Sequence, residues 1–202
     1  MKKIDIVCII DKSGSMSSIA KEAIKGFNKF LSDQQKADYE AKMTLLLFDT
    51  KFYKPEDNVD VNKIVPLNNK TYIANNCTAL YDALGGEIDC YLDKLASIPK
   101  KDRCDKTLFV IITDGEENSS HRYHKDLIKL MVEEMREEFK IEFIFLAANQ
   151  DACFVAESMG MSKDNAFNFN ATGEGITIAY NKMSEATTYY ATTDVSDNLF
   201  QK

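Results

Sequence analysis

Short hydrophobic runs alternate along the chain with longer segments in which hydrophobic positions recur every three or four residues. The runs are rich in β-branched and aromatic residues and cover residues 4–10, 43–48, 107–113, 141–147 and, more weakly, 165–169. Continuous hydrophobic runs of this length are typical of strands buried on both faces, as in a parallel sheet covered by helices. The pattern therefore predicts a sheet inside the molecule.

The segments between these runs have helical spacing. Hydrophobic residues recur on one face of residues 17–36, 80–98 and 123–139, and residues 176–190 are predicted to form the last helix. Strands that alternate with helices indicate βαβ crossovers. We therefore expect an α/β fold with a doubly wound, mostly parallel sheet and helices on both faces.

The region between residues 48 and 71 departs from this pattern. It contains three short extended segments, and Pro55 and Pro66 interrupt them. The segments are residues 51–54, 59–61 and 64–67. Proline is confined to the edges of sheets because it has no N–H group to donate. We predict a hairpin or one antiparallel edge strand here. No linker or internal repeat is visible, so residues 1–202 are expected to form a single domain with its core at about 3–190.

Composition and charge exclude several classes of partner. The chain has 25 Lys and Arg against 32 Asp and Glu, a net charge of −7, which disfavours binding to nucleic acid. The first hydrophobic run is too short and too polar to cross a membrane, so no membrane partner is expected. The five cysteines are odd in number and lack a CxxC motif, which favours a reducing, cytoplasmic location. The sequence does not indicate an oligomeric state.

Polar residues gather where predicted strands end. The strand at 4–10 leads into Asp-Lys-Ser-Gly-Ser-Met at 11–16, and the strand at 107–113 leads into Asp-Gly-Glu-Glu at 114–117. Between them, residues 75–80 open a helix with Asn-Asn-Cys-Thr-Ala-Leu. Ligands of open α/β sheets bind beyond the carboxyl ends of the strands. These three junctions are therefore expected to place oxygen donors on one rim of the sheet.

The oxygen donors at these junctions are two carboxylates and three hydroxyls: Asp11, Asp114, Ser13, Ser15 and Thr78. Hard divalent cations prefer such ligands, and either Mg²⁺ or Mn²⁺ accepts this set. Gly14 permits a tight turn that aims the first loop inward. Because only two of the donors are charged, the ion keeps positive charge and an exchangeable position, which a carboxylate of a partner can fill.

Each of these features alone is more often structural. Asp, Ser and Thr are good helix N-caps, and Asp-Gly is a common turn. Together, in this order and each at a strand end or a helix start, they are hard to explain by capping.

Three motifs together resemble the von Willebrand factor A (vWA) domain and its metal-ion-dependent adhesion site (MIDAS). They are Asp-x-Ser-Gly-Ser-Met at 11–16, Cys-Thr-Ala-Leu-Tyr-Asp-Ala-Leu at 77–84 and Ile-Ile-Thr-Asp-Gly-Glu-Glu at 111–117. The resemblance covers about residues 3–190. The chain is most similar to stand-alone bacterial or phage members of the family. Its residues 144–152 also resemble the corresponding stretch of those members.

The resemblance implies a Rossmann-like fold and a role for each matching position. Asp11, Ser13 and Ser15 would ligate the metal from the first loop. Thr78 would ligate it directly when a ligand is bound, and Asp114 directly or through water.

One position departs from the family pattern. Asn76, two residues before Thr78, stands where the family often has glycine, and Asn tolerates left-handed backbone geometry better than most residues. Glu116 and Glu117 follow the Asp114 loop and either tune the field around the metal or form a solvated loop face. The residues expected to support the site from its loops are Gly14, Asn76, Gly115 and Glu116.

The resemblance and the donor set favour a protein-binding module, not an enzyme, whose partner presents Asp or Glu to the cation. A metal-dependent hydrolase such as a phosphatase is an alternative, since two aspartates and Mg²⁺ can position a phosphate. Lys12 is the only basic residue inside the motifs, and no good base is evident. A scaffold without a working metal site is a second alternative.

His121 and His124 lie just after the third motif, three residues apart. With Glu117 they form either a second metal site or, more commonly for such a pair, part of a helix surface.

Overall fold

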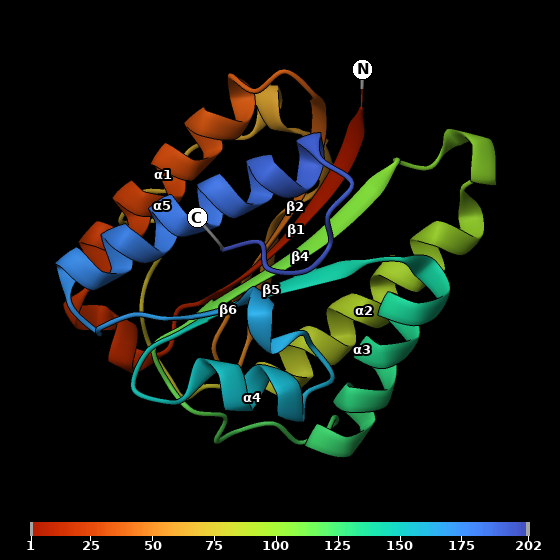
Figure 1. Ribbon diagram of the computed structural model, residues 1–202. Coiled ribbons are helices and arrows are strands. Elements are labelled where there is room, and N and C mark those ends of the chain that lie inside the picture. Colours follow the sequence, from red (N-terminus) through yellow and green to blue (C-terminus); the bar gives the residue numbers. More distant parts are fainter. Residues whose placement is uncertain (1, 201–202) are drawn as a thin grey trace.

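The computed structural model describes residues 2–200, and within them six strands form one sheet in the order β3-β2-β1-β4-β5-β6 (Figure 1). The strands are β1 (Lys3–Asp11), β2 (Glu40–Phe48), β3 (Phe52–Asp60), β4 (Lys106–Thr113), β5 (Glu142–Ala147) and β6 (Ala166–Asn168). All neighbouring pairs are parallel except β2 and β3, which are antiparallel. The predicted doubly wound sheet with one antiparallel edge strand is confirmed.

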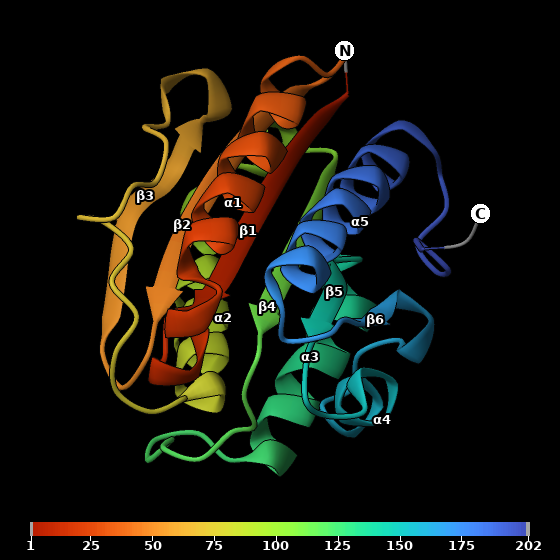
Figure 2. The same ribbon diagram turned by 90° about the vertical axis from the view of Figure 1, so that its left-hand side faces the viewer.

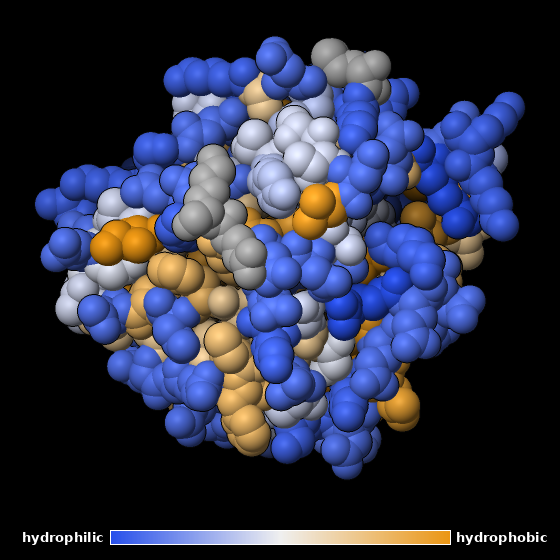
Figure 3. All heavy atoms as spheres, in the orientation of Figure 1, coloured by the Kyte–Doolittle hydropathy of each residue, from blue (hydrophilic) through white to orange (hydrophobic). Residues whose placement is uncertain are grey.

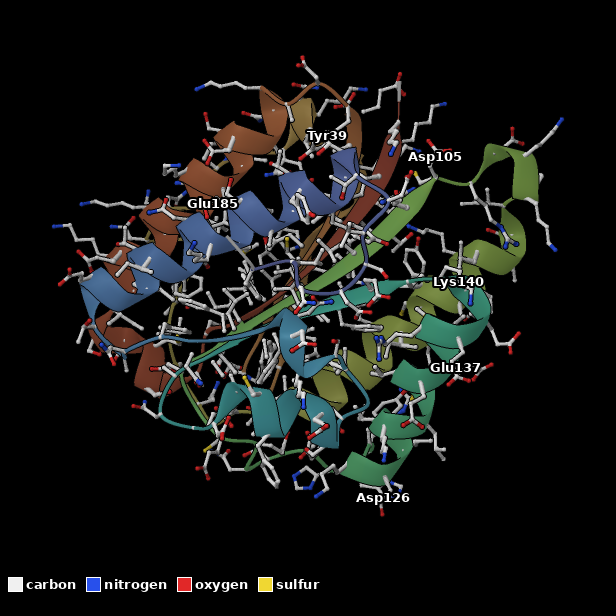
Figure 4. All side chains as sticks on the ribbon, in the orientation of Figure 1. Tyr39, Asp105, Asp126, Glu137, Lys140 and Glu185 are labelled. Carbon is white, nitrogen blue, oxygen red and sulfur yellow. The ribbon has the colours of Figure 1, made fainter. Side chains whose placement is uncertain are left out.

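Helices cover both faces of the sheet (Figures 1 and 2). They are α1 (Ala20–Gln35), α2 (Leu80–Ser97), α3 (Lys125–Phe139), α4 (Ala152–Ser158) and α5 (Gly173–Thr192). Helices α1 and α5 pack side by side on one face, and α2 and α3 lie on the other. Asp126 and Glu137 of α3 point away from the sheet in Figure 4, whereas Arg136 of the same helix pairs with Glu142 of β5 at 3.3 Å.

The side chains of β1 alternate between two hydrophobic cores. Cys8 and Ile10 pack in the core beneath α1 and α5, whereas Val7 and Ile9 pack in the core beneath α2 and α3. All four are buried, because successive side chains of a strand point to opposite faces and both faces are covered. This is why β1 appears in the sequence as one continuous hydrophobic run.

The antiparallel edge differs in detail from the prediction. The expected break at Pro55 is wrong, because β3 runs through it without interruption. Between the pairs Tyr53–Leu47 and Glu56–Leu45 the register shifts by one residue, so a bulge accommodates the proline on this edge strand. Residues 64–67 form no regular secondary structure.

Helix boundaries also differ from the hydrophobic pattern. The helix predicted at 17–36 begins with a 3₁₀ turn, Gly14–Ser18, before α1. The short helix α4 was not predicted, and Asp151 caps it by accepting a hydrogen bond from the backbone of Phe154. None of the helices among residues 2–200 is long and hydrophobic enough to span a membrane.

The topology brings the candidate loops together. Strands β1 and β4 are parallel neighbours, with Ile10 opposite Ile112, so the residues that follow them emerge at the same edge of the sheet. This edge lies at the lower side of Figures 1 and 2, where α2 and α3 also begin.

Candidate metal centre

Asp11 is the last residue of β1 and is fully buried. One carboxylate oxygen accepts a hydrogen bond from the backbone N–H of Ser13 at 2.6 Å, and the other accepts from the Thr113 hydroxyl at 2.5 Å. The Tyr72 hydroxyl donates to the Asp11 backbone carbonyl at 2.5 Å. The first two contacts orient the carboxylate, and the third holds the backbone of Asp11 at the end of the strand.

The serine hydroxyls connect the loop after β1 to the loop after β4. Ser13 Oγ lies 3.0 Å from Ser15 Oγ, and Ser15 Oγ donates to Asp114 Oδ1 at 2.6 Å. The 3₁₀ turn at Gly14–Ser18 curls the chain tightly enough to bring both hydroxyls to the same side. A chain of hydrogen-bonded oxygen atoms thus links two loops that are 99 residues apart in sequence.

Thr78 reaches the same place from the loop before α2. A Cβ atom placed on Gly115 would lie 3.1 Å from Thr78 Oγ1 and 3.5 Å from Ser15 Oγ. The two hydroxyls therefore face the same space beside Gly115. Because glycine has no side chain, that space stays open. The structure thus brings all five predicted donors to one edge of the sheet.

Gly14 and Asn76 meet in this region. The Gly14 N–H donates to the Asn76 carbonyl at 2.9 Å, and a Cβ atom on Gly14 would lie only 3.3 Å from that oxygen. Gly14 is needed for this close approach; unlike Asn76, whose φ is 59°, it does not have a positive φ. Asn76 thus supports the loop by the left-handed backbone geometry that the sequence predicts for it.

Burial dominates the electrostatics of the two aspartates. It raises the pKa of Asp11 to about 6, although hydrogen bonds from Thr113 and Ser13 lower it and the charge of Asp114 raises it further. Burial also raises the pKa of Asp114, and the Ser15 hydrogen bond opposes this. Two neighbouring buried carboxylates are costly to ionise unless a cation lies between or beside them. Oxygen donors of this kind fit a hard divalent cation.

Comparisons with known proteins identify the family to which the chain belongs. A family model for the von Willebrand factor type A domain matches residues 5–182, which is most of the chain. The chain belongs to this vWA family. No curated protein sequence matches the chain significantly.

Solved vWA structures share the fold at low sequence identity. The vWF domain of the pilus tip protein Mfa5 from Porphyromonas gingivalis has a TM-score of 0.64 at 10% identity, over 96% of this chain and 99% of that one. The pilus adhesin SpaC from Lactobacillus rhamnosus GG has a TM-score of 0.67 at 13% identity, over 95% of this chain.

Proximal thread matrix protein 1 from the mussel byssus, in a structure with a zinc-occupied MIDAS motif, has a TM-score of 0.62 at 12% identity, over 93% of this chain. The chain spans only 46% of the mussel protein and 30% of SpaC.

Asp49, just after β2, supports the loops of the candidate site, and the sequence pattern does not reveal this role. It is buried, pairs with the ammonium group of Lys12 and accepts from the Asn76 side chain at 3.1 Å. Burial raises the pKa of Asp49, but Lys12, the Lys51 backbone and Asn76 outweigh this and hold it below its usual value. Lys12 is therefore engaged with Asp49 and does not neutralise the donors.

The loop after β4 is held by a second group of residues. Asn118 Oδ1 accepts from the Thr78 backbone N–H at 3.0 Å, and the Asn118 N–H donates to the Thr78 carbonyl at 3.0 Å. The Glu117 carboxylate accepts from the backbone N–H groups of Tyr81 at 2.9 Å and Ser119 at 2.8 Å. Glu117 is thus a structural link between two loops, whereas Glu116 is exposed.

The end of β5 completes this support. Asn149 donates from its side chain to the Asp114 carbonyl at 2.9 Å, and Gln150 donates to the Gly115 carbonyl at 3.1 Å. The signal that predicts them is their position directly after a buried parallel strand, at the same carboxyl edge as Asp11.

The alternative second metal site at His121 and His124 is not supported. The Glu117 carboxylate is occupied by backbone N–H groups, and both histidines are exposed. Among residues 2–200, no three His, Cys, Asp or Glu side chains form a cluster suited to a metal ion. A cation in this part of the chain therefore needs hydroxyl donors in addition to carboxylates.

Proposed function

We propose that this vWA chain binds one divalent cation, Mg²⁺ or Mn²⁺, and uses it to bind the carboxylate of an Asp or Glu on a protein partner. The proposed ligands are Asp11, Ser13, Ser15, Thr78 and Asp114. The observation that carries the proposal is the convergence of two buried carboxylates and three hydroxyls at one edge of the sheet.

The charge of the donor set favours an acidic ligand. The two carboxylates of Asp11 and Asp114 match the formal charge of a divalent cation. The other three ligands are neutral hydroxyls that donate little electron density, so the ion remains a strong Lewis acid. Ser15 and Gly115 lie at the outer side of the site, since Ser15 is exposed and Gly115 is partly exposed. A partner carboxylate would therefore reach the ion from solvent on this side.

A related structure supports the kind of ligand. The mussel protein with the zinc-occupied MIDAS motif shares the fold of this chain, with a TM-score of 0.62. It shows that a vWA fold accepts a divalent cation at its MIDAS motif. From this relative we infer only that the ion of this chain is a divalent cation, and not that it is zinc.

The hydrolase alternative is weaker. A phosphatase needs a base and cationic groups around the phosphate. Lys12 is the basic residue in the motif loops, and its ammonium group pairs with Asp49. A binding role needs neither a base nor cationic groups, so it accounts for the site more simply than catalysis does.

Direct counting of bound Mn²⁺ by electron paramagnetic resonance tests the proposal. Wild-type protein is expected to bind one Mn²⁺ that Mg²⁺ displaces. Asp11→Asn and Asp114→Asn, which keep the shape of the side chains, should each weaken binding by more than roughly tenfold. Asp126→Asn, at an exposed carboxylate on α3, is the matched control and should bind as wild type does.

Two results would contradict the proposal. One is wild-type protein that binds no Mn²⁺ above the level of Asp11→Asn. The other is tight Mn²⁺ binding that no carboxylate-bearing peptide or protein alters at any concentration, because a MIDAS ion with an exchangeable position must accept such a ligand.

A further inference from the structure

A groove lies next to the proposed metal site, between the start of α2, the loop after β4 and helix α4. Its volume is about 370 Å³. Tyr81, Phe154 and Val155 form its hydrophobic part, and Glu116 and Lys125 form part of its charged wall. Hydrophobic atoms reach the surface over α4 among mostly hydrophilic ones in Figure 3.

The groove borders the loops that carry the proposed ligands Thr78 and Asp114. Tyr81 follows Thr78 by three residues, and Glu116 follows Asp114 by two. Gln150, which also lines the groove, donates to the carbonyl of Gly115, the residue beside the Thr78 and Ser15 hydroxyls. A peptide advances roughly 3.3 Å per extended residue, so a chain held at the ion reaches the groove within a few residues.

Phe154 is the main hydrophobic feature of this groove. Its side chain is 67% exposed, whereas its neighbours Ala152 and Ala156 on α4 are buried in the core. The Asp151 carboxylate accepts from the Phe154 backbone N–H at 3.1 Å, which caps the start of the helix and holds the backbone of Phe154 beside the groove. Aromatic side chains, Phe among them, are enriched in the buried centres of protein interfaces.

The charges of the groove restrict which partner fits. Glu116 and Asp151 are both exposed and acidic, and they face the groove on its metal side and its α4 side. With Glu117 they outnumber Lys125, the basic residue of the lining, so the groove would repel a second carboxylate of the partner next to the one at the ion. A segment with one acidic residue and hydrophobic neighbours fits better than an acidic run.

We propose that the partner segment, whose carboxylate binds the cation under the proposed function, also carries a large hydrophobic side chain two to four residues away that packs on Phe154 and Tyr81. The site therefore recognises two features at a fixed spacing. The carboxylate supplies dependence on the metal, and the hydrophobic side chain supplies selectivity among acidic segments.

A displayed peptide library tests the spacing. Each peptide carries one fixed Asp with four randomised positions on either side, and wild-type protein selects peptides in Mg²⁺ that EDTA then releases. We expect enrichment of Phe, Leu, Met or Ile at one fixed distance from the Asp and depletion of further Asp and Glu. EDTA-released peptides with no hydrophobic preference at any position would overturn the inference.

Matched variants of the protein test the location. Phe154→Ser should weaken binding of an enriched peptide by roughly tenfold, as the loss of one interface anchor does. Leu130→Ser removes a hydrophobic side chain that is 64% exposed on α3 and should leave binding unchanged. Replacing the hydrophobic residue of the peptide by Ser should lower its affinity for wild type, but not its affinity for Phe154→Ser.

The outcomes separate the two proposals. EDTA-sensitive binding that is equal in wild type and Phe154→Ser overturns the groove and leaves the metal-dependent function standing. Binding that depends on Phe154 but not on Mg²⁺ overturns the proposed function, and with it the two-feature recognition. The absence of any EDTA-sensitive peptide counts against both.

Discussion

At the scale of single residues, the carboxylate of Asp82 shows how this chain holds an irregular loop. Asp82 lies in the first turn of α2 and accepts from the backbone N–H groups of His121, Arg122 and Tyr123 at 2.8–2.9 Å. Partial burial raises its pKa, but these three donors outweigh burial and hold the pKa below its usual value. The ionised form of Asp82 therefore stabilises the segment between the loop after β4 and α3.

This pKa predicts how Asp82→Asn depends on pH. Because the folded-state pKa is depressed, the stabilisation is present above the unfolded-state pKa of about 3.9 and is lost as the pH falls through the folded-state value. At pH 7, Asp82→Asn should lower the free energy of unfolding by about 1–2 kcal/mol. Urea denaturation at a series of pH values measures the difference, which should shrink in acid. A difference that stays constant with pH would contradict the assignment.

Asp11 illustrates which parts of the site the sequence predicts. Its position after a buried strand and its spacing from Ser13 and Ser15 are visible in the chain itself. The hydroxyl of Thr113, which donates to its carboxylate, is not visible in this way, because it comes from a strand a hundred residues away. A threonine at the end of a β-branched run looks like any other strand residue.

Asn118 provides a test of such support at the residue scale. Both its side chain and its backbone hydrogen-bond to Thr78, so Asn118→Ala should leave the Thr78 hydroxyl less well positioned and weaken Mn²⁺ binding by roughly tenfold. Asn69→Ala, in an exposed loop, is the control. Paramagnetic resonance titration measures both, and equal affinity of the two variants would show that Asn118 does not position the ligand.

At the scale of elements, the strands were easier to predict than the connections. Strands β1, β4 and β5 are buried on both faces, so their sequences are continuous hydrophobic runs. Strand β3 and helix α4 lack such a signal: β3 is half exposed and contains Pro55, and α4 has only seven residues. Their form depends on long-range pairing and capping, which a local pattern does not contain.

Two helix glycines test how closely the elements pack. A Cβ atom on Gly26 of α1 would lie 2.2 Å from the ring of Tyr180 on α5, whereas a Cβ on Gly86 of α2 would meet nothing within 4 Å. Gly26→Ala should therefore force the two helices apart and destabilise the protein by about 1–3 kcal/mol. Gly86→Ala should stabilise it by about 0.5–1 kcal/mol, because alanine favours the helix.

Chemical denaturation of both glycine variants distinguishes packing from helix propensity. If propensity alone decided, the two substitutions would stabilise the protein alike. Stabilisation by Gly26→Ala would thus show that α1 and α5 are not in close contact at this position.

At the scale of the whole molecule, the fold buries two neighbouring carboxylates at the proposed site, and this burial lowers its stability locally. The two cores are filled with hydrophobic side chains on both sides of the sheet, while Asp11 and Asp114 are buried beside each other at its edge. The fold tolerates this loss of stability because the buried carboxylates are confined to the ends of β1 and β4. A bound cation would remove this loss in the folded state only, since the five donors converge only when the strands are paired.

Thermal unfolding should therefore depend on the divalent cation. A ligand that binds only the folded state at about 100 times its dissociation constant adds roughly 2.7 kcal/mol, which for a domain of this size raises the Tm by roughly 5–10 °C. Wild type should melt at a higher temperature in Mg²⁺ or Mn²⁺ than in EDTA, and the double variant Asp11→Asn with Asp114→Asn should melt at the same temperature in all three.

In EDTA the double variant should be at least as stable as wild type, because it no longer buries two neighbouring carboxylates without a cation. A double variant that is unfolded in EDTA would mean that these aspartates serve the fold itself, and a rise of its Tm with Mg²⁺ equal to that of wild type would place the cation elsewhere.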